Sequence, residues 1–166
     1  MMVAMLYGLL TALIILGLDQ WTKQMMLEAL FYQSIRLEIA PFFHLTPVWN
    51  YGVSFGMFQT DSATGAHVLI GVALLITTIM AYVLWRTADR YLQIAIGFII
   101  GGALGNVIDR FRFGAVVDFF DFHLNGYHWP AFNVADAAIT LGVILIIIDH
   151  FTSGEKEVTN TVHDYW

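Results

Sequence analysis

Four apolar segments, each of 15 to 18 residues, dominate the hydrophobic pattern of the chain. A helix needs about 20 apolar residues to cross a bilayer, and each segment reaches that length when its neighbours are included. In lipid, isolated apolar segments satisfy their backbone hydrogen bonds only as helices. The pattern therefore predicts four transmembrane helices, over about residues 3–23, 67–86, 91–110 and 134–151.

The first apolar segment is interpreted as a retained span. A cleaved signal peptide is the alternative, but no basic residue precedes the segment and no small-x-small cleavage site follows it. Three further apolar segments follow as well. We therefore treat residues 1–166 as a single membrane domain, with a polar tail over residues 152–166.

Two connections between the spans carry signals typical of β-structure. Over residues 49–56, large apolar residues such as Trp49 and Tyr51 alternate with small or polar ones, which is the period of a strand. In the other connection, Asn125-Gly126 is a two-residue hairpin signal. Both connections lie on the same side of the membrane. We expect a small β-element there, over about residues 35–60.

The third apolar segment carries glycines at four-residue spacing, Gly97, Gly101 and Gly105. Small residues at this spacing let a second helix approach closely. We expect these glycines to serve packing.

Composition supports a membrane protein. Hydrophobic residues make up 58% of the chain and charged residues 12%, and the mean hydropathy is +0.70. An ordinary soluble domain has about 25% charged residues, so the composition argues against a soluble enzyme, a disordered region and a coiled coil. The net charge of −6 argues against a nucleic-acid groove. Without cysteine, thiol catalysis and Cys-ligated zinc are excluded as well.

Polar residues gather at the ends of the spans that face the side with the two β-type connections. Such residues are functional candidates, because polar side chains are costly at membrane depth. Asp19 and Lys23 are four apart, which suits an ion pair on one helix face. Asn106, Asp109 and Arg110 share a face of the third span. A neutralised or capped helix end is the structural alternative for both groups.

Two further aspartates stand in apolar surroundings. Asp118 interrupts an apolar run, and Asp136 lies in the first turn of the fourth span, three residues after Asn133, a good N-cap. A cap alone does not require a second buried acid. Two carboxylates about 4 Å apart repel by roughly 4 kcal/mol at an effective dielectric near 20. Such a pair holds one shared proton near neutral pH and is suited to acid–base catalysis.

Asp121, His123 and His128 surround the predicted hairpin turn. Two histidines and an aspartate can bind zinc, but nothing else in the sequence completes such a site, so exposed hairpin histidines are the favoured interpretation. We expect no metal site.

The polar motifs resemble those of lipoprotein signal peptidases, the type II signal peptidases of bacteria. The resemblance rests on five blocks in the family's order, between about residues 3 and 151: DQWTK (19–23), WNYGVSFG (49–56), GGALGNVIDR (101–110), VVDF (116–119) and FNVAD (132–136).

The resemblance implies an α-helical integral membrane protein with four transmembrane helices and a small β-element, the cradle, on the extracytoplasmic face. It implies an aspartic endopeptidase of the bacterial cytoplasmic (inner) membrane, with both termini in the cytoplasm. The orientation rests on the family, because Lys and Arg number three on one side and four on the other, which gives no positive-inside signal.

The implied reaction removes the signal peptide of a prolipoprotein by cleavage before the diacylglyceryl-modified cysteine. Asp118 and Asp136 fall on the catalytic pair. The other polar positions shape the site and hold lipid and peptide: Asp19, Lys23, Asn50, Asn106, Asp109, Arg110 and Asn133. The expected partners are diacylglyceryl-modified prolipoproteins and membrane lipid. No nucleic acid, metal or organic cofactor is expected, and the expected state is a monomer.

Three other functions compete with this one. A proton-coupled carrier or channel would carry polar residues through the full depth of its spans, whereas here they cluster at one end. A scaffold without chemistry leaves the two acids in apolar surroundings unexplained. A presenilin-type intramembrane protease would require a Gly-x-Gly-Asp motif, which neither aspartate has.

Overall fold

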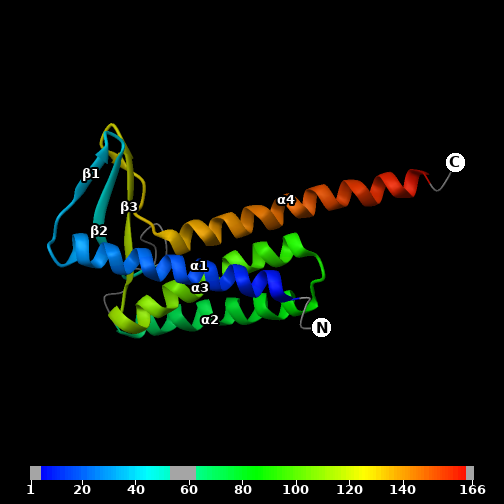
Figure 1. The fold of residues 1–166 in the computed structure, drawn as a ribbon, viewed down its shortest axis with the longest axis horizontal. Coiled ribbons are helices and arrows are strands. Elements are labelled where there is room, and N and C mark those ends of the chain that lie inside the picture. The colour runs from blue at the N-terminus through cyan, green and yellow to red at the C-terminus, as the bar shows by residue number, and fades with distance from the viewer. Residues whose placement is uncertain (1–4, 53–62, 164–166) are drawn as a thin grey trace.

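The computed structural model describes residues 5–52 and 63–163, as helices that lie along one long axis and a small sheet at one end (Figure 1). The helices are α1 (Leu6–Met26), the π-helical turn η2 (Leu27–Phe31), α2 (Ala63–Arg86), α3 (Arg90–Phe113) and α4 (Val134–His163). The strands are β1 (Leu37–Ala40), β2 (Phe43–Asn50), β3 (Val116–Leu124) and β4 (Tyr127–His128).

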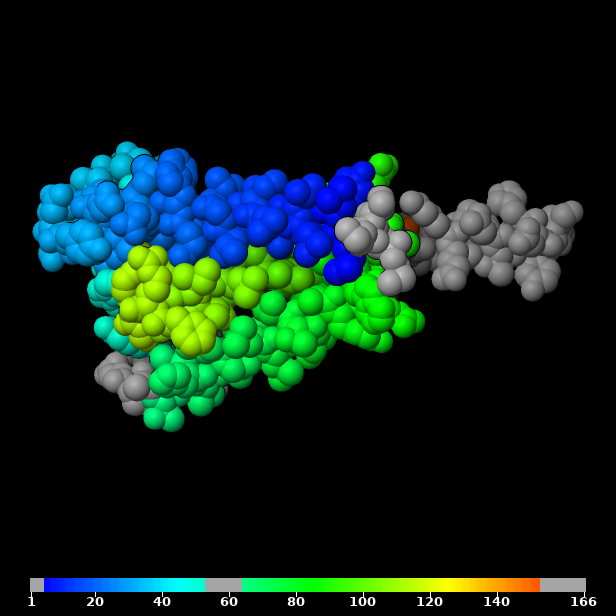
Figure 2. Space-filling model, turned by 60° about the horizontal axis from the view of Figure 1, so that its bottom comes forward, coloured from blue at the N-terminus to red at the C-terminus, as the bar shows by residue number. Residues whose placement is uncertain are grey.

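Helix α3 lies at the centre and packs against α1, α2 and α4. Figure 2 shows α1, the end of α3 and α2 side by side along one face. The predicted glycine packing is confirmed, because a Cβ at Gly97 would lie 2.5 Å from the carbonyl oxygen of Gly8 and one at Gly101 2.6 Å from that of Ala12. Without side chains at these positions, the backbones of α1 and α3 come into direct contact.

Three described helices are long and apolar enough to cross a membrane, α2 from Thr64, α3, and α4 as far as Thr152. They match three of the four predicted spans. Helix α1 has 21 residues, but its C-terminal half carries Asp19, Gln20 and Lys23, and it is not among the three. Four spans therefore remain a prediction.

The sheet is antiparallel with the strand order β1-β2-β3-β4. The predicted hairpin is confirmed: Asn125 and Gly126 link β3 to β4 with positive φ angles of 50° and 83°. The sheet combines strands from both predicted connections, since β2 pairs with β3. The β-element is therefore larger than the segment 35–60 predicted for it.

One boundary needs correction. The strand predicted over residues 49–56 is β2, which begins at Phe43 and ends at Asn50, where the Asn50 side chain accepts the backbone N–H of Gly52 and turns the chain. Residues 53–56 lie outside the described part. The segment after residue 152, predicted as a polar tail, continues α4 as a helix to His163 and contains good helix formers such as Glu155 and Lys156.

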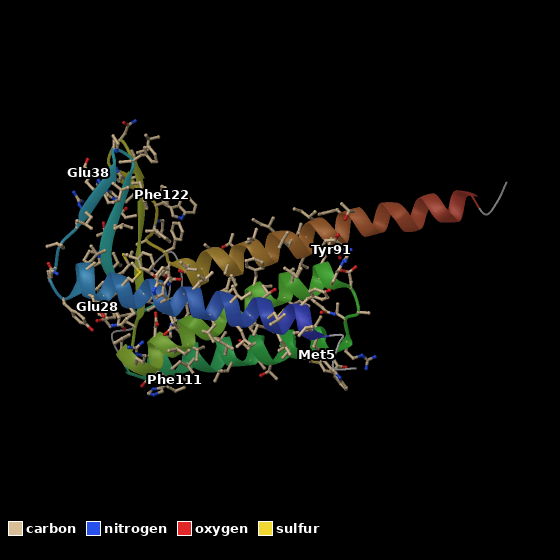
Figure 3. The ribbon with its side chains drawn as sticks, in the orientation of Figure 1. Met5, Glu28, Glu38, Tyr91, Phe111 and Phe122 are labelled. Carbon is tan, nitrogen blue, oxygen red and sulfur yellow. The ribbon has the colours of Figure 1, made fainter. Side chains whose placement is uncertain are left out.

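The sheet and the α2–α3 connection lie at opposite ends of the molecule (Figure 1). Figure 3 places Glu38 and Phe122 on the sheet end, and Met5 and Tyr91 on the other. The helix ends that carry the predicted polar residues therefore meet the sheet.

Candidate active site

The two candidate catalytic aspartates lie on different elements that meet where α4 begins. Asp118 is on β3 and is 1% exposed, whereas Asp136 lies in the first turn of α4 and is half-buried. The predicted cap is confirmed. The Asn133 side-chain oxygen accepts the N–H of Asp136 at 3.0 Å, and Asp136 Oδ2 accepts the N–H of Asn133 at 3.3 Å. This reciprocal capping fixes the Asp136 side chain at the helix start.

Asn133 also connects this cap to the second aspartate. Its amide Nδ2 donates to Asp118 Oδ1 at 2.7 Å, and it lies 3.2 Å from Asn106 Oδ1. Asn106 in turn donates its own Nδ2 to Asp136 Oδ1 at 2.8 Å. Two asparagine amides therefore hold the two carboxyl groups within one hydrogen-bonded network.

A buried ion cluster lies behind the two asparagines. Lys23 Nζ lies 2.9 Å from Asp19 Oδ2 and 2.8 Å from Asp109 Oδ2, and it donates to Asn106 Oδ1 at 2.9 Å. These three contacts use all three ammonium protons of Lys23. The predicted Asp19–Lys23 pair is present, and Asp109 completes it. We call Asp19, Lys23 and Asp109 the Lys23 cluster.

Each carboxylate of the Lys23 cluster also accepts a backbone N–H. Asp19 Oδ1 accepts from Ala135 at 2.9 Å, and Asp109 Oδ2 accepts from Val117 at 3.1 Å. Ala135 and Val117 directly precede Asp136 and Asp118. The cluster therefore holds the main chain next to both candidate catalytic residues.

Burial changes the acidity of Asp118. Removal from water, followed by the negative charge of Asp136, raises its pKa from 3.8 to about 7, against the opposing hydrogen bonds of Asn50 and Asn133. A carboxyl group with this pKa exchanges a proton near neutral pH, as an acid–base catalyst must.

Asn50 and Arg110 close the site on the sheet side. Asn50 Nδ2 donates to Asp118 Oδ2 at 2.9 Å, so amide groups occupy both oxygens of Asp118. Arg110 donates to the carbonyl oxygen of Gly52 at 2.7 Å and is held on α3 by the carbonyl oxygen of Asn106 at 3.4 Å. Asn50 thus joins the end of β2 to Asp118 on β3, and Arg110 joins the residues just after β2 to α3.

A hollow of about 290 Å³ opens beside these groups. Its polar end is formed by Asn50, Asn106, Arg110 and Asp136. Its apolar walls come from α2, α3 and α4, and include Val72, Ile76, Ile99 and Ile139. An amphipathic molecule can therefore place a polar group at Asp136 and an apolar part between the helices.

The sequence interpretation missed the role of Gln20. Its amide lies within hydrogen-bond distance of Asp19 Oδ2 (3.2 Å), the Gly105 carbonyl oxygen (3.2 Å) and Asp109 Oδ1 (3.0 Å). It ties the two carboxylates of the Lys23 cluster together. The available signal was a polar residue at the membrane boundary, next to Asp19.

The hairpin histidines form a separate group. His128 Nδ1 lies 2.7 Å from Asp121 Oδ1, and His123 Nε2 lies 3.0 Å from His44 Nε2. Among the side chains that the structure describes, in residues 5–52 and 64–152, no three of His, Cys, Asp or Glu are placed to hold a metal ion.

Comparison with known proteins gives concordant matches. A family model described as signal peptidase (SPase) II matches residues 11–152. A lipoprotein signal peptidase of Alteromonas mediterranea is 41% identical over 143 residues, which cover 84% of this chain and 78% of the relative. One of Beijerinckia indica subsp. indica is 42% identical over 152 residues, 91% of each chain.

Among solved structures, a bacterial membrane enzyme determined by the in meso method at 2.3 Å resolution superposes with a TM-score of 0.76. It is 31% identical, and the match covers 90% of each chain.

Proposed function

The chain belongs to the signal peptidase II family, and from this premise we propose that it is an aspartic endopeptidase that removes the signal peptide from bacterial prolipoproteins. Cleavage occurs before the diacylglyceryl-modified cysteine, and Asp118 and Asp136 are the catalytic residues. The observation that carries the proposal is the network in which Asn133 and Asn106 join the two carboxyl groups.

In the proposed reaction, the pair Asp118 and Asp136 holds one proton. The ionised carboxylate takes a proton from water, whose oxygen attacks the scissile carbonyl carbon while the protonated carboxyl donates a hydrogen bond to the carbonyl oxygen. The C–N bond then breaks, and the leaving amine receives a proton from the pair. Water and two carboxyl groups suffice for this chemistry. A helix N-terminus favours negative charge, so Asp136 is the preferred ionised member and Asp118 the protonated one.

The remaining polar residues have supporting roles. Asp19, Lys23 and Asp109 position the backbone next to the pair, through the contacts to Ala135 and Val117. Asn106 and Asn133 orient the carboxyl groups. Asn50 and Arg110 line the polar end of the hollow, where a planar guanidinium can meet a peptide carbonyl or a lipid ester oxygen.

The protein is proposed to be a monomeric, single-domain enzyme of the inner membrane with four spans. Helix α1 supplies the fourth span, because Lys23 and its two carboxylate partners are internally neutralised in part and buried against α3. The sheet then lies at the extracytoplasmic face, and both termini lie in the cytoplasm.

The test is cleavage of a purified diacylglyceryl-modified prolipoprotein in detergent, followed as a gel shift. We expect the wild type to cut before the modified cysteine, and Asp118→Asn and Asp136→Asn each to lose at least about 10³-fold in rate, since each removes one of the two acid–base groups. Asp149→Asn, at the opposite end of the span in α4, is the matched control and should retain activity. Cleavage by either active-site variant at the wild-type rate would remove the catalytic assignment.

A further inference from the structure

Three histidine rings form a row across strands β2, β3 and β4. The ring centroids of His44 and His123 lie 4.1 Å apart, and those of His123 and His128 lie 4.8 Å apart. Asp121 Oδ1 lies 2.7 Å from Nδ1 of His128 and balances a positive charge on that ring. The proposed reaction uses none of these side chains, so the row is free to serve another purpose.

The contact between the first two rings limits the charge that they can carry. His44 Nε2 and His123 Nε2 lie 3.0 Å apart, so one nitrogen donates its proton and the other must supply a lone pair. His44 is 5% exposed, and its Nδ1 has no hydrogen-bond partner among the described residues. Charging both rings would place two positive charges at hydrogen-bond distance and leave a buried Nδ1–H unpaired. The closed pair therefore carries at most one positive charge.

The charged groups around His44 reinforce this limit. Glu38 on β1 and Asp121 on β3 pair with His44 across the sheet, and their negative charges favour its protonation. Burial, followed by the charges of His123 and Arg36, acts in the opposite direction and prevails, so the pKa of His44 is lowered. In the closed sheet, His44 is thus the ring that stays neutral.

An irregularity in the pairing of β2 with β3 separates the histidines from the aspartates. Residues 43–45 pair with residues 120–122, and residues 48–50 pair with residues 116–118, but the register shifts between the two groups. Pro47 lies at this shift and has no N–H to donate to a neighbouring strand. The outer half of the sheet comprises β1, residues 43–45 and 120–124, and β4. It can open while the pairing next to the aspartates stays closed.

We propose that the outer half of the sheet opens in acid, when both rings of the His44–His123 pair become charged. Glu38 and Phe122 mark this half in Figure 3, where it projects away from α1. Once the rings separate, each accepts a proton in contact with water. Each pH unit below about 6.5, the pKa of a free histidine, then favours the open form by a further factor of about ten. In the proposed topology this half responds to acid on the extracytoplasmic side.

Amide hydrogen exchange tests the proposal, followed by NMR of the full chain in detergent micelles at pH 7.5 and pH 5.0. Rates are expressed as protection relative to an unstructured peptide at the same pH. An open form that binds one proton more than the closed form should cost the outer half about 30-fold in protection over this interval. The N–H of His123, which donates to the Phe42 carbonyl oxygen at 2.9 Å, is one reporter. Residues 48–50 should change by less than about threefold.

Two substitutions assign the effect to the histidine pair. In His44→Gln the side-chain amide can still bond with His123 but does not titrate, so protection of the outer half should change by less than about threefold. His67→Gln removes an exposed histidine of α2 and should behave as the wild type. Asp118 exchanges its proton near pH 7 in all three proteins, so its effect cancels. Asp121 stays ionised throughout, because its pKa is lowered from 3.8.

The measurement needs no substrate, so its outcome is independent of the proposed function. A wild type that keeps its protection at pH 5.0 would overturn the proposal, and so would an equal loss in the wild type and His44→Gln. An equal loss over residues 43–45 and 48–50 would show that the sheet opens as one unit, which also contradicts it.

Discussion

Asp118 combines full burial with two amide hydrogen bonds, one to each carboxyl oxygen. The amide donors favour the charged carboxylate, but burial and the charge of Asp136 outweigh them and leave the pKa raised to about 7. The folded protein therefore keeps a proton on Asp118 that the unfolded chain releases above pH 4. This residue should make stability depend on pH.

We predict that unfolding free energy falls as pH rises from about 4 to 7 through Asp118, by up to roughly 4 kcal/mol, and levels off above. Thermal unfolding in detergent between pH 4 and pH 9 measures this trend. In Asp118→Asn the decline should be absent, so the wild type loses stability relative to the variant as pH rises. If the stabilities of the wild type and of Asp118→Asn change in parallel from pH 4 to pH 9, the prediction is wrong.

Asp121 provides a control of opposite sign. Burial alone would raise its pKa, but hydrogen bonds from His128 and Thr46 outweigh burial and lower it. Its contribution to stability is present above pH 4 and is lost as pH falls. Asp121→Asn should therefore weaken the protein most at neutral pH and least in acid.

The residues proposed for the site could be selected from the sequence, but the contacts that join them could not. An aspartate in an apolar run is visible in a single sequence, as Asp118 shows, because burying an acid is costly. The three contacts of the Asn133 amide with Asp118, Val117 and Asn106 were not visible, since they join elements distant in sequence. Gln20 was missed for the same reason.

At the level of elements, local signals predicted the apolar helices and the β3–β4 turn well, because a long apolar run and an Asn-Gly turn both depend on neighbouring residues. The pairing of β2 with β3 brings Asn50 opposite Val116 and was not predicted. Residues 50 and 116 are far apart in the sequence, so their pairing leaves no local pattern. The same pairing brings Asn50 to Asp118.

The glycines on α3 give a prediction at this scale. Gly101→Ala should destabilise the protein by about 1–3 kcal/mol, because the new methyl group would lie 2.6 Å from the Ala12 carbonyl oxygen and force α1 away. Gly71→Ala is the matched control, since a Cβ there meets nothing within 4 Å. In a helix interior this control change should stabilise by roughly 0.5–1 kcal/mol.

Melting temperatures of both variants in one detergent measure the difference. Equal shifts for Gly101→Ala and Gly71→Ala would show that close contact of α1 with α3 does not stabilise the fold. Cleavage activity should fall with stability in Gly101→Ala, because α1 carries two members of the Lys23 cluster.

For the whole molecule, the proposed four-span arrangement places the β3–β4 hairpin and the α2–α3 connection on opposite sides of the membrane. The chain has no cysteine, so single introduced cysteines can be labelled without background. Tyr127 is 84% exposed on the hairpin, and Ala88 is exposed in the α2–α3 connection.

We expect an impermeant maleimide to label Tyr127→Cys in intact spheroplasts, and Ala88→Cys only after the membrane is opened. Labelling of both variants in intact spheroplasts would show that α3, which separates the two positions, does not cross the membrane. Labelling of Ala88→Cys alone would invert the proposed orientation. Gly71→Cys, on the lipid-facing side of α2, is a control that should remain unlabelled in both preparations.

The sequence alone left this orientation open, because basic residues are evenly divided between the two sides. The structure groups the sheet at one end and the α2–α3 connection at the other, which follows from helices that alternate in direction (Figure 1). The assignment of the sheet end to the extracytoplasmic side rests on the family relationship. The labelling experiment tests that assignment.

The contact between Asp19 and the Ala135 N–H joins residues 116 positions apart, and this has a consequence for biogenesis. The ribosome delivers α1 first, with Lys23 already neutralised by Asp19 one turn away. Asp109 arrives with α3, and Asp136 only with the last helix. A nascent chain that ends before α4 therefore lacks Asp136 and the Ala135 N–H that Asp19 accepts. Under the proposed function, the order of translation therefore leaves the site incomplete until α4 has been made.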